Sequence, residues 1–493
     1  MRVKEGRLIN SSAPLKFTFD DKEFSGYEGD TLASALIAND VKVIGRSFKY
    51  HRPRGLMTDG SQEPNGLVEI RDGNQTTPNV RLTTQELVSD LKVYSQNYWG
   101  TLKWDFLELN DLISPFLSAG FYYKTFMWPK KFWEGLYEPS IRRAAGLGRL
   151  SMANNSDYYE KAYAFCDVLV IGSGPAGIMA ALTAANAGVQ VIFCEEDSIF
   201  GGRLNSENYD VDGKPGHIWA KEKIDQLSQM ENVRCMSRTT VTGAYDGGTY
   251  GAVERISHHV KVKDDALPVE IFWRIVAKGA VYAAGSMERS IAFQNNDRPG
   301  VFTASAMRGY LNRYGVSLGE KAVIFGNNND AFRTAKDLHS SGIEIAAYVD
   351  SRSDTTIQGD FPIFKGAMVT NVRGRMGVKE VEVTEANGSI VKVETGMLGV
   401  SGGWNPTVHL TCHMNGKPEW NDQLAAFIPV PGMIPGLEVA GAATGVFSTK
   451  GCMKSGVFRA KEILKNLGVS YKTTSVPEAE SDPTVIVPLW SVP

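Results

Sequence analysis

The first 95 or so residues alternate between hydrophobic and polar positions in a way that predicts a small β-rich module. Residues 15–25 alternate around a polar turn, which predicts a β-hairpin. Thr31 follows as a suitable N-cap for a helix over residues 32–39. Residues 66–71 predict a further strand. We therefore expect several strands and one short helix in this part of the chain.

Residues 97–150 are dense in aromatic side chains but show no clean periodicity. A segment this apolar does not extend freely into water as a linker. We expect it to lie across another surface, either a domain of its own chain or a partner subunit. The aromatic residues are Trp99, Trp104, Phe106, Phe116, Phe121, Tyr122, Tyr123, Phe126, Trp128, Phe132, Trp133 and Tyr137.

Two later stretches have the pattern of a strand, a helix and a second strand. In the first, residues 168–171 lead through a glycine-rich turn into an alanine-rich helix, and residues 189–194 form the next strand. The second stretch begins at residue 321 and returns to a strand at residues 345–349. Repeated β-α-β units are typical of an α/β fold with parallel sheets, so we predict that fold class.

The turn of the first unit carries Gly172-Ser-Gly174-Pro-Ala-Gly177, a dinucleotide-binding fingerprint when a strand precedes it and a helix follows. The first glycine allows a tight turn, the second lets a pyrophosphate approach the backbone, and the third lets helix and strand pack closely. The helix N-terminus offers free N–H groups and a partial positive charge to the phosphates. Glu195 ends the second strand, where its carboxylate would accept hydrogen bonds from an adenosine ribose and repel a 2′-phosphate. NAD or FAD is therefore favoured over NADP.

Further glycines and charged residues near this motif extend the predicted cofactor site. A Gly-Gly-Arg run after Glu195 stands where two-dinucleotide flavoproteins pass backbone along the cofactor, and two late segments resemble parts of the same architecture. The candidate cofactor-binding residues are Gly172, Gly174, Pro175, Ala176, Gly177, Glu195, Glu196, Gly202, Arg203, Gly285 and Gly441.

One of those late segments, residues 437–443, resembles the Gly-Asp motif of glutathione-reductase-like flavoproteins, whose Asp usually binds FAD. Ala442 stands at the position of that Asp, which weakens the case for FAD and leaves NAD more plausible. The second β-α-β unit has only Gly326 where an intact fingerprint has three glycines. We expect this second unit to keep the fold while binding no nucleotide.

Charge and composition exclude several classes of function. The chain of 493 residues has a net charge of −3 and a pI near 6.2, so nothing supports binding to nucleic acid or to an anionic membrane. No stretch approaches the roughly 18 apolar residues of a membrane span, and the N-terminus does not resemble a secretory signal. The five cysteines are widely spaced without a CxxC pair, which favours a reducing compartment and predicts a cytoplasmic protein.

One run with two histidines and a cysteine resembles a metal site. His409 and His413 flank Cys412, but the pattern from residue 408 predicts a strand, on which residues four apart do not converge as they would on a helix. His258 and His259 are expected on opposite faces of another strand. We therefore predict no metal site, and without a CxxC pair we also set dithiol reductase chemistry aside.

Residues 45–55 resemble the approach to an iron–sulfur loop in ferredoxin-like domains of amine and opine oxidases. Cysteines follow that run in cluster-binding relatives, whereas the first 165 residues here contain none. Because iron–sulfur clusters are held by cysteine thiolates, we predict a cysteine-less ferredoxin-like β-grasp domain with no iron–sulfur cluster. The run also carries basic residues, which either face a flavin phosphate or a partner subunit or belong to a solvated loop.

Several runs together resemble the heterotetrameric sarcosine oxidase alpha subunit family over nearly the whole chain. They are residues 45–55, 114–128, 137–148, 298–303 and 402–406. The resemblance implies a two-dinucleotide-binding-domain, glutathione-reductase-like flavoprotein fold. The predicted domains are a ferredoxin-like domain lacking iron–sulfur ligands (1–96), an aromatic-rich connecting segment (97–162), a first dinucleotide-binding domain (163–300 and 401–468), a second, degenerate one (301–400) and a C-terminal extension (469–493).

The resemblance also implies an oxidoreductase complex that demethylates sarcosine to glycine. In that family the alpha subunit binds NAD, the beta subunit holds FAD and the amine substrate, FMN lies near their interface, and smaller subunits complete the heterotetramer. The folate-binding, aminomethyltransferase-like half of the family is absent from this sequence, which is either a fragment or a shorter relative. We name no catalytic residue, because amine oxidation would belong to the partner.

Other functions stay open at this point. The chain could be the FAD-binding large subunit of an opine, cyanide-forming or N-methylglutamate oxidoreductase. It could also be a non-redox scaffold with a structural NAD. An independent reductase is disfavoured, because neither a cysteine pair nor an acid–base pair is evident.

Overall fold

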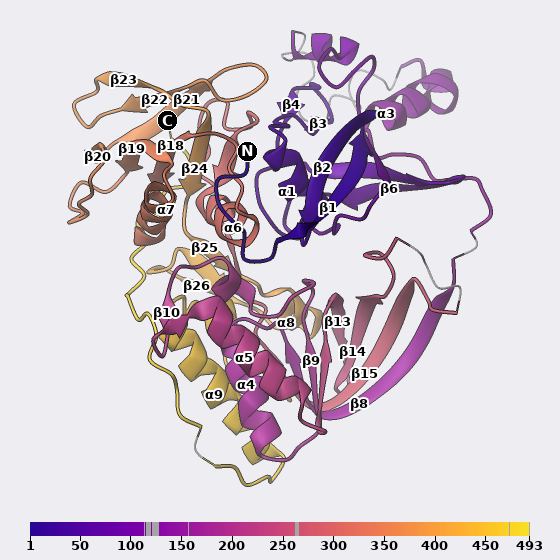
Figure 1. Cartoon of the computed structure of the whole chain (residues 1–493), viewed down its shortest axis with the longest axis vertical. Helices are drawn as coiled ribbons and strands as arrows, with labels where there is room; N and C mark the ends of the chain where they lie inside the picture. The colour runs from indigo at the N-terminus through magenta and orange to yellow at the C-terminus, as the bar shows by residue number, and fades with distance from the viewer. Residues whose placement is uncertain are drawn as a thin grey trace.

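The computed structural model describes residues 1–112, 114, 120, 128–155, 157–261, 266–472 and 474–492. Figure 1 shows three bodies, with the N-terminal module and the second β-α-β unit side by side above the first β-α-β unit. Most of the predicted run 114–128, including five of its aromatic residues, lies outside the described residues.

The N-terminal module is a five-stranded sheet of order β2-β1-β7-β5-β6 with helix α1 (Leu32–Ala38) packed on it. The predicted hairpin and helix are confirmed: β1 and β2 pair as an antiparallel hairpin, and the Thr31 hydroxyl accepts the N–H of Ser34 at 3.2 Å. A two-stranded ribbon of β3 and β4 lies beside this sheet. The strands are β1 (Asn10–Phe19), β2 (Lys22–Glu28), β3 (Gly45–Arg46), β4 (Pro53–Arg54), β5 (Leu67–Asp72), β6 (Gln75–Arg81) and β7 (Leu91–Ser95).

The first β-α-β unit is a seven-stranded sheet of order β12-β9-β8-β15-β14-β13, with β28 also paired to β15. Strands β12, β9, β8, β15 and β28 run parallel, whereas β13, β14 and β15 form an antiparallel meander. Helices α4, α5 and α9 lie together beside this sheet (Figure 1). The elements are β8 (Tyr159–Ile171), α4 (Pro175–Asn186), β9 (Val191–Cys194), α5 (Gly216–Ser228), β12 (Val233–Met236), β13 (Thr239–Tyr245), β14 (Thr249–Arg255), β15 (Glu270–Tyr282), β28 (Leu437–Val439) and α9 (Thr449–Asn466).

The second β-α-β unit is a five-stranded parallel sheet of order β17-β24-β18-β19-β20, with the small antiparallel meander β21-β22-β23 inserted between β20 and β24. Parallel strand pairs in both units confirm the predicted α/β class. The elements are β17 (Val301–Thr303), α6 (Ala304–Tyr314), β18 (Lys321–Gly326), α7 (Asn329–Ser340), β19 (Glu344–Asp350), β20 (Ile363–Lys365), β21 (Met368–Arg373), β22 (Glu380–Thr384), β23 (Ile390–Glu394) and β24 (Met397–Ser401).

Short elements connect these bodies, and two strand predictions need correction. Residues 409–413 form a helix, α8, and not the predicted strand, and His258 and His259 lie in a turn and not on opposite faces of a strand. The described residues contain no group of three His, Cys, Asp or Glu that could hold a metal ion. The remaining elements are η1 (Phe106–Asp111), η3 (Lys130–Phe132), η4 (Trp133–Tyr137), α3 (Glu138–Ala144), η5 (Gly202–Asn205), β10 (Asp210–Val211), β11 (Lys214–Pro215), β16 (Ser286–Glu288), β25 (Trp404–Pro406), α8 (His409–His413), β26 (Glu419–Asn421), β27 (Ala426–Ile428) and η6 (Gly441–Thr444).

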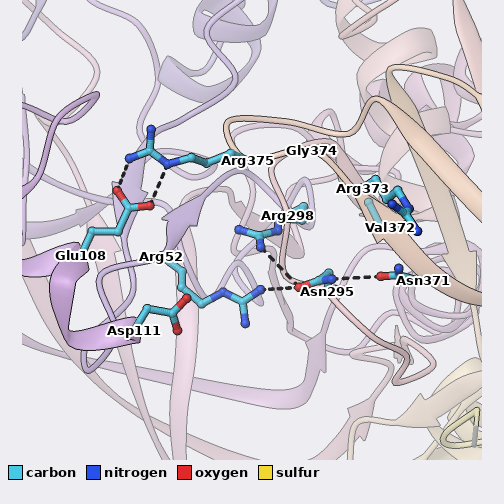
Figure 2. A pocket seen from close by; sticks show the side chains of 10 residues that line it. All are labelled: Arg52, Glu108, Asp111, Asn295, Arg298, Asn371, Val372, Arg373, Gly374 and Arg375. Atoms are coloured by element: carbon cyan, nitrogen blue, oxygen red, sulfur yellow. Dashed lines mark hydrogen bonds and ion pairs between the residues drawn. The ribbon is translucent and has the colours of Figure 1, made fainter. Parts of the chain in front are cut away.

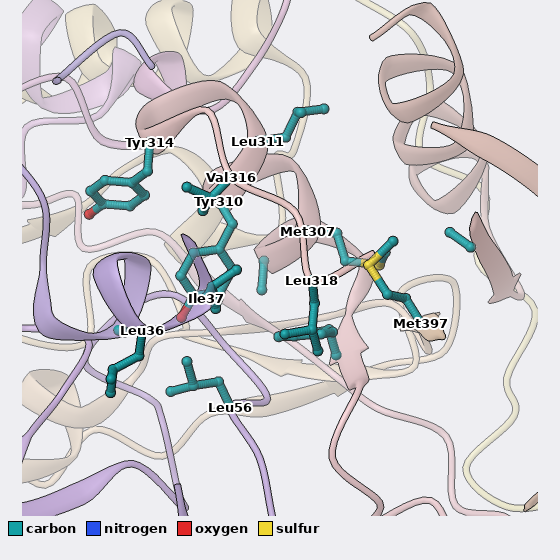
Figure 3. Packing of buried hydrophobic residues seen from close by; sticks show 14 of the residues in the cluster. Leu36, Ile37, Leu56, Met307, Tyr310, Leu311, Tyr314, Val316, Leu318 and Met397 are labelled. Carbon is teal, nitrogen blue, oxygen red and sulfur yellow. The ribbon is translucent and has the colours of Figure 1, made fainter. Parts of the chain in front are cut away.

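The N-terminal module and the second β-α-β unit share one hydrophobic core. Leu36 and Ile37 of α1 belong to the same buried cluster as Met307 and Tyr310 of α6 (Figure 3). The Tyr310 hydroxyl also donates to the carbonyl oxygen of Thr58 at 2.8 Å. Because burial of apolar surface stabilises by about 25 cal/mol per Å², this shared core fixes the module against α6.

The described part of the aromatic segment leaves much of its apolar surface in water. Trp99, Trp104 and Phe106 each expose 65% of their surface, and Trp128 exposes 81%. No helix within the described ranges is both long and apolar enough to cross a membrane.

Candidate dinucleotide-binding site

The fingerprint turn joins β8 to α4 at the centre of the first sheet. Gly172 has a φ of +92°, and a Cβ there would stand 2.5 Å from the carbonyl oxygen of Ala283, so the position requires glycine. A Cβ on Gly177 would overlap with the carbonyl oxygen of Gly172. The first turn of α4 can therefore approach the end of β8 only because position 177 carries no side chain.

Gly174 differs from its two neighbours because a Cβ there would meet no protein atom within 4 Å. Its backbone is extended, with φ −65° and ψ −176°, and it forms the N-cap of α4. No side chain caps this helix N-terminus, and Pro175 at the first helical position has no N–H to satisfy. The turn thus leaves space and unsatisfied N–H groups at the positive end of a helix, which suits a pyrophosphate.

Glu195 lies at the end of β9 with only 8% of its surface exposed. One carboxylate oxygen accepts the N–H and the hydroxyl of Ser173 at 2.8 and 2.5 Å, and the other accepts the N–H of Asp197 at 2.9 Å. Burial raises the pKa of Glu195 to about 7, against the lowering effect of these hydrogen bonds. Since a carboxylate offers about four acceptor positions, Glu195 keeps capacity for one ribose hydroxyl.

The remaining predicted residues lie around the same turn. A Cβ on Gly202 would stand 2.9 Å from the Cα of Gly174, and one on Gly441 would stand 2.7 Å from the Cβ of Ala176. Gly285 follows β15, two residues after Ala283, whose carbonyl oxygen would meet a Cβ on Gly172. The structure therefore brings these glycines together around the N-terminus of α4.

Two charged residues among the cofactor-binding candidates, Glu196 and Arg203, contact other parts of the protein. Glu196 is exposed and accepts a hydrogen bond from Ser61 of the N-terminal module at 2.8 Å. The Arg203 guanidinium pairs with Glu207 and, at 2.6 Å, with Asp330 of the second β-α-β unit, so it links two parts of the protein.

Sequence reasoning missed Ser173, the residue between the first two glycines of the fingerprint. Its side chain is fully buried, donates to Glu195 and accepts the N–H of Gly201 at 2.9 Å. Ser173 therefore ties three parts of the site together: the fingerprint turn, the end of β9 and the Gly201-Gly202 turn. The serine between the first two glycines of the fingerprint was the feature of the sequence that could have identified this role.

The corresponding turn of the second β-α-β unit is filled by protein groups. The Asn328 side chain caps α7 by accepting the N–H of Asp330 at 3.0 Å and that of Ala331 at 3.2 Å. Asn327 exchanges hydrogen bonds with Val487 of the C-terminal segment, at 3.1 and 2.7 Å. An anion at this helix N-terminus would have to displace both.

Two family models match parts of the chain. Residues 12–98 match a 2Fe-2S iron-sulfur cluster binding domain, and residues 167–263 match an FAD dependent oxidoreductase family. Among solved structures, L-proline dehydrogenase from P. horikoshii superimposes with a TM-score of 0.65 at 21% sequence identity, covering 96% of this chain and 76% of that chain. That likeness shows a shared fold with Rossmann-like dinucleotide-binding domains.

Curated relatives match the chain over its whole length. The sarcosine oxidase subunit alpha of Rhizobium meliloti (strain 1021) is 46% identical, covering 100% of this chain and 50% of that protein. The sarcosine oxidase subunit alpha of Corynebacterium sp. (strain P-1) is 30% identical, covering 98% of this chain and 47% of that protein. The chain therefore spans about half the length of the curated relatives it matches.

Fold, site and family match together define a class, proteins built on Rossmann-like dinucleotide-binding domains. Within that class the chain is a homologue of sarcosine oxidase alpha subunits, which confirms the resemblance predicted from the sequence.

The cofactor prediction needs correction. It excluded an iron–sulfur cluster and assigned FAD to a partner, whereas residues 12–98 match a cluster-binding family and residues 167–263 match an FAD-dependent one. Cluster-binding proteins carry cysteines in the loop that follows β4. Here that loop is held by the buried Glu63 carboxylate, which accepts the N–H groups of Met57, Thr58 and Asn65 at 2.7–2.8 Å. Residues 12–98 contain no cysteine and do not supply the thiolate ligands of such a cluster, so we assign no electron-transfer step to this module.

Proposed function

We propose that this chain is the dinucleotide-binding subunit of an oxidoreductase complex that acts on the CH–NH group of a secondary amine such as sarcosine. The observation that carries the proposal is the open space and uncapped helix N-terminus at Gly174. The full-length similarity to sarcosine oxidase alpha subunits supports the amine as substrate.

Each residue of the site would have a separate role toward a bound adenine dinucleotide. The N–H groups at the start of α4 would bind the pyrophosphate, and Glu195 would accept a ribose hydroxyl. Ser173 would hold the Glu195 carboxylate in position. The bound dinucleotide would supply hydride-transfer chemistry.

Two dinucleotides are candidates, each with its own support. Ala442 stands where the Gly-Asp motif of glutathione-reductase-like flavoproteins has its Asp, which favours NAD. The match of residues 167–263 to an FAD dependent oxidoreductase family favours FAD. We propose that the second β-α-β unit binds neither, because Asn328 and Val487 fill its turn.

We propose that a flavin-bearing beta subunit and smaller subunits complete the complex and that amine oxidation takes place in the beta subunit. The exposed Trp99, Trp104, Phe106 and Trp128 support a partner surface, because large aromatic side chains are typical of interface anchors. The cytoplasmic location stays a prediction.

The test is to purify the chain, denature it and identify the released nucleotide by absorbance and mass. NAD or FAD in the supernatant supports the proposal and decides between the two candidates. A chain that neither carries nor binds an adenine dinucleotide contradicts it.

A further inference from the structure

A cavity of about 610 Å³ lies where the N-terminal module meets the second β-α-β unit (Figure 2). Its walls come from the β3–β4 loop, η1, the loop before β17, and the end of β21. None of the fingerprint residues lines it. The volume falls in the range of small-molecule sites, about 300–1,000 Å³.

Two guanidinium groups meet at one neutral oxygen in this cavity. The Asn295 side-chain oxygen accepts from Arg52 at 2.7 Å and from Arg298 at 3.3 Å (Figure 2). The Asn295 amide nitrogen donates to Asn371 at 2.9 Å, and Asn371 donates to Glu382 at 2.9 Å, which fixes the direction of the Asn295 oxygen. The structure therefore holds two cations together around an acceptor that carries no charge.

Arginines outnumber carboxylates in the lining of the cavity, which contains Glu108 and Asp111 against Arg52, Arg298, Arg373 and Arg375. Around this lining, Arg52 and Arg54 share Asp297, Arg46 and Arg375 share Glu108, and Arg373 pairs with Glu380 and Glu382. The cavity wall therefore keeps a surplus of positive charge.

Among the described residues that line the cavity, Arg298 is the arginine without a close counter-ion. Within the described ranges it has no carboxylate at ion-pair distance, and Asp297 and Asp111 act on it only at longer range. Burial, followed by the charge of Arg52, lowers the pKa of Arg298. The Nε atoms of Arg298 and Arg52 are both buried without a hydrogen-bond partner. Buried donors of this kind normally have a partner.

We propose that this cavity binds a phosphate group, with Arg298 and Arg52 as its main ligands. A phosphate dianion would match the two cations and accept from their planar N–H arrays. The cavity has room for more than the phosphate itself, so the group can arrive free or as part of a small phosphomonoester. This site goes beyond the dinucleotide function proposed above and does not depend on it.

Isothermal titration of the full chain with inorganic phosphate, and separately with ribose 5-phosphate, tests the proposal at constant ionic strength set with chloride. Both probes are expected to bind, and Arg298→Gln is expected to weaken binding at least about tenfold, as for loss of a charge-assisted hydrogen bond. Arg274→Gln removes an equal charge from an exposed position on β15 and should leave the Kd unchanged. Tighter binding of ribose 5-phosphate identifies an esterified ligand, and tighter binding of inorganic phosphate identifies a free one.

A second variant separates ligand binding from loss of fold. Asn295→Asp places one carboxylate oxygen between the two guanidiniums and the other against the side-chain oxygen of Asn371, so its Tm should change little while phosphate binding is abolished. The proposal is overturned if neither probe binds the wild type, if Arg298→Gln binds like the wild type, or if Arg274→Gln loses as much affinity. It is also overturned if folded Asn295→Asp binds phosphate with unchanged affinity.

Discussion

Glycine is required at two positions of the turn after β8 for different physical reasons. Gly172 has a left-handed φ beside the Ala283 carbonyl, whereas Gly177 lies against the Gly172 carbonyl with no space for a methyl group. Substitution at either residue has to move backbone, because the atoms in contact are carbonyl oxygens.

Gly177→Ala is therefore expected to destabilise the protein by about 1–3 kcal/mol, the usual cost of forcing extra volume into a packed site. Thermal unfolding measures it. Gly188→Ala would be a poor control because of its φ of +80°, whereas Gly396→Ala has neither a positive φ nor an atom near its Cβ and should leave the Tm within about 1 °C. An unchanged Tm in Gly177→Ala would show that α4 is not packed as described.

The raised pKa of Glu195 predicts a pH dependence of nucleotide binding. Above about pH 7 the carboxylate is ionised and accepts a ribose hydroxyl more strongly than its protonated form does. Affinity should therefore rise about fivefold from pH 6 to pH 8, corresponding to about 1 kcal/mol. Titrations at several pH values measure the profile.

Substitution of each of two neighbouring carboxylates, Glu195 and Glu196, tests which group causes this pH dependence. Glu195→Gln should flatten the profile, and Glu196→Gln should keep it, because Glu196 is exposed and contacts Ser61. A profile that stays steep in Glu195→Gln would assign the titration to another group.

At the scale of elements, a largely buried ring of charges joins the two β-α-β units. Arg203 and Arg308 each pair with both Glu207 and Asp330, and Arg308 exposes only 1% of its side chain. Burial opposes the ionised form of Asp330, but the charges of Arg203 and Arg308 outweigh it and hold its pKa well below the ordinary value. Loss of one member would leave an unpaired buried charge, so the ring fixes the two units against each other.

Glu288 lies beside this ring, and burial together with the charge of Asp330 raises its pKa to about 7. Because its pKa in the folded protein exceeds the unfolded value, the folded state loses stability as pH rises from about 4.5 to 7. Glu288→Gln removes this effect, so its Tm should exceed that of the wild type by about 3 °C at pH 8 and by less than about 1 °C at pH 5.

Thermal unfolding at the two pH values tests this prediction. Glu222→Gln, which removes an exposed carboxylate on α5, should act alike at both. An equal effect of Glu288→Gln at pH 5 and pH 8 would place the titrating group elsewhere.

Local sequence patterns predicted the helices and strands whose formation depends mainly on residues close together in the chain. The hairpin of β1 and β2 and the Thr31-capped helix follow from alternation and capping alone. The helix over residues 409–413 was missed because a short apolar run fits both a strand and a helix. The pairing of Arg203 with Asp330 spans 127 residues, and no local pattern reports a contact of that kind.

At the scale of the whole molecule, the structure predicts one dinucleotide per chain. The first β-α-β unit has an open turn at Gly174, while the second has its turn filled by Asn328 and Val487. The sequence predicted this difference from the missing glycines after Gly326, but it gave no sign that the C-terminal segment would lie there.

The most direct test of the dinucleotide site is to titrate wild type and Gly174→Ala with NAD and with FAD, measuring stoichiometry and Tm together. We expect one nucleotide per wild-type chain. In Gly174→Ala we expect binding at least about tenfold weaker with an unchanged Tm, because a methyl group at this position meets no protein atom and would occupy the space of the pyrophosphate. Full-affinity binding in Gly174→Ala, or two nucleotides per chain, would contradict the assignment of the site.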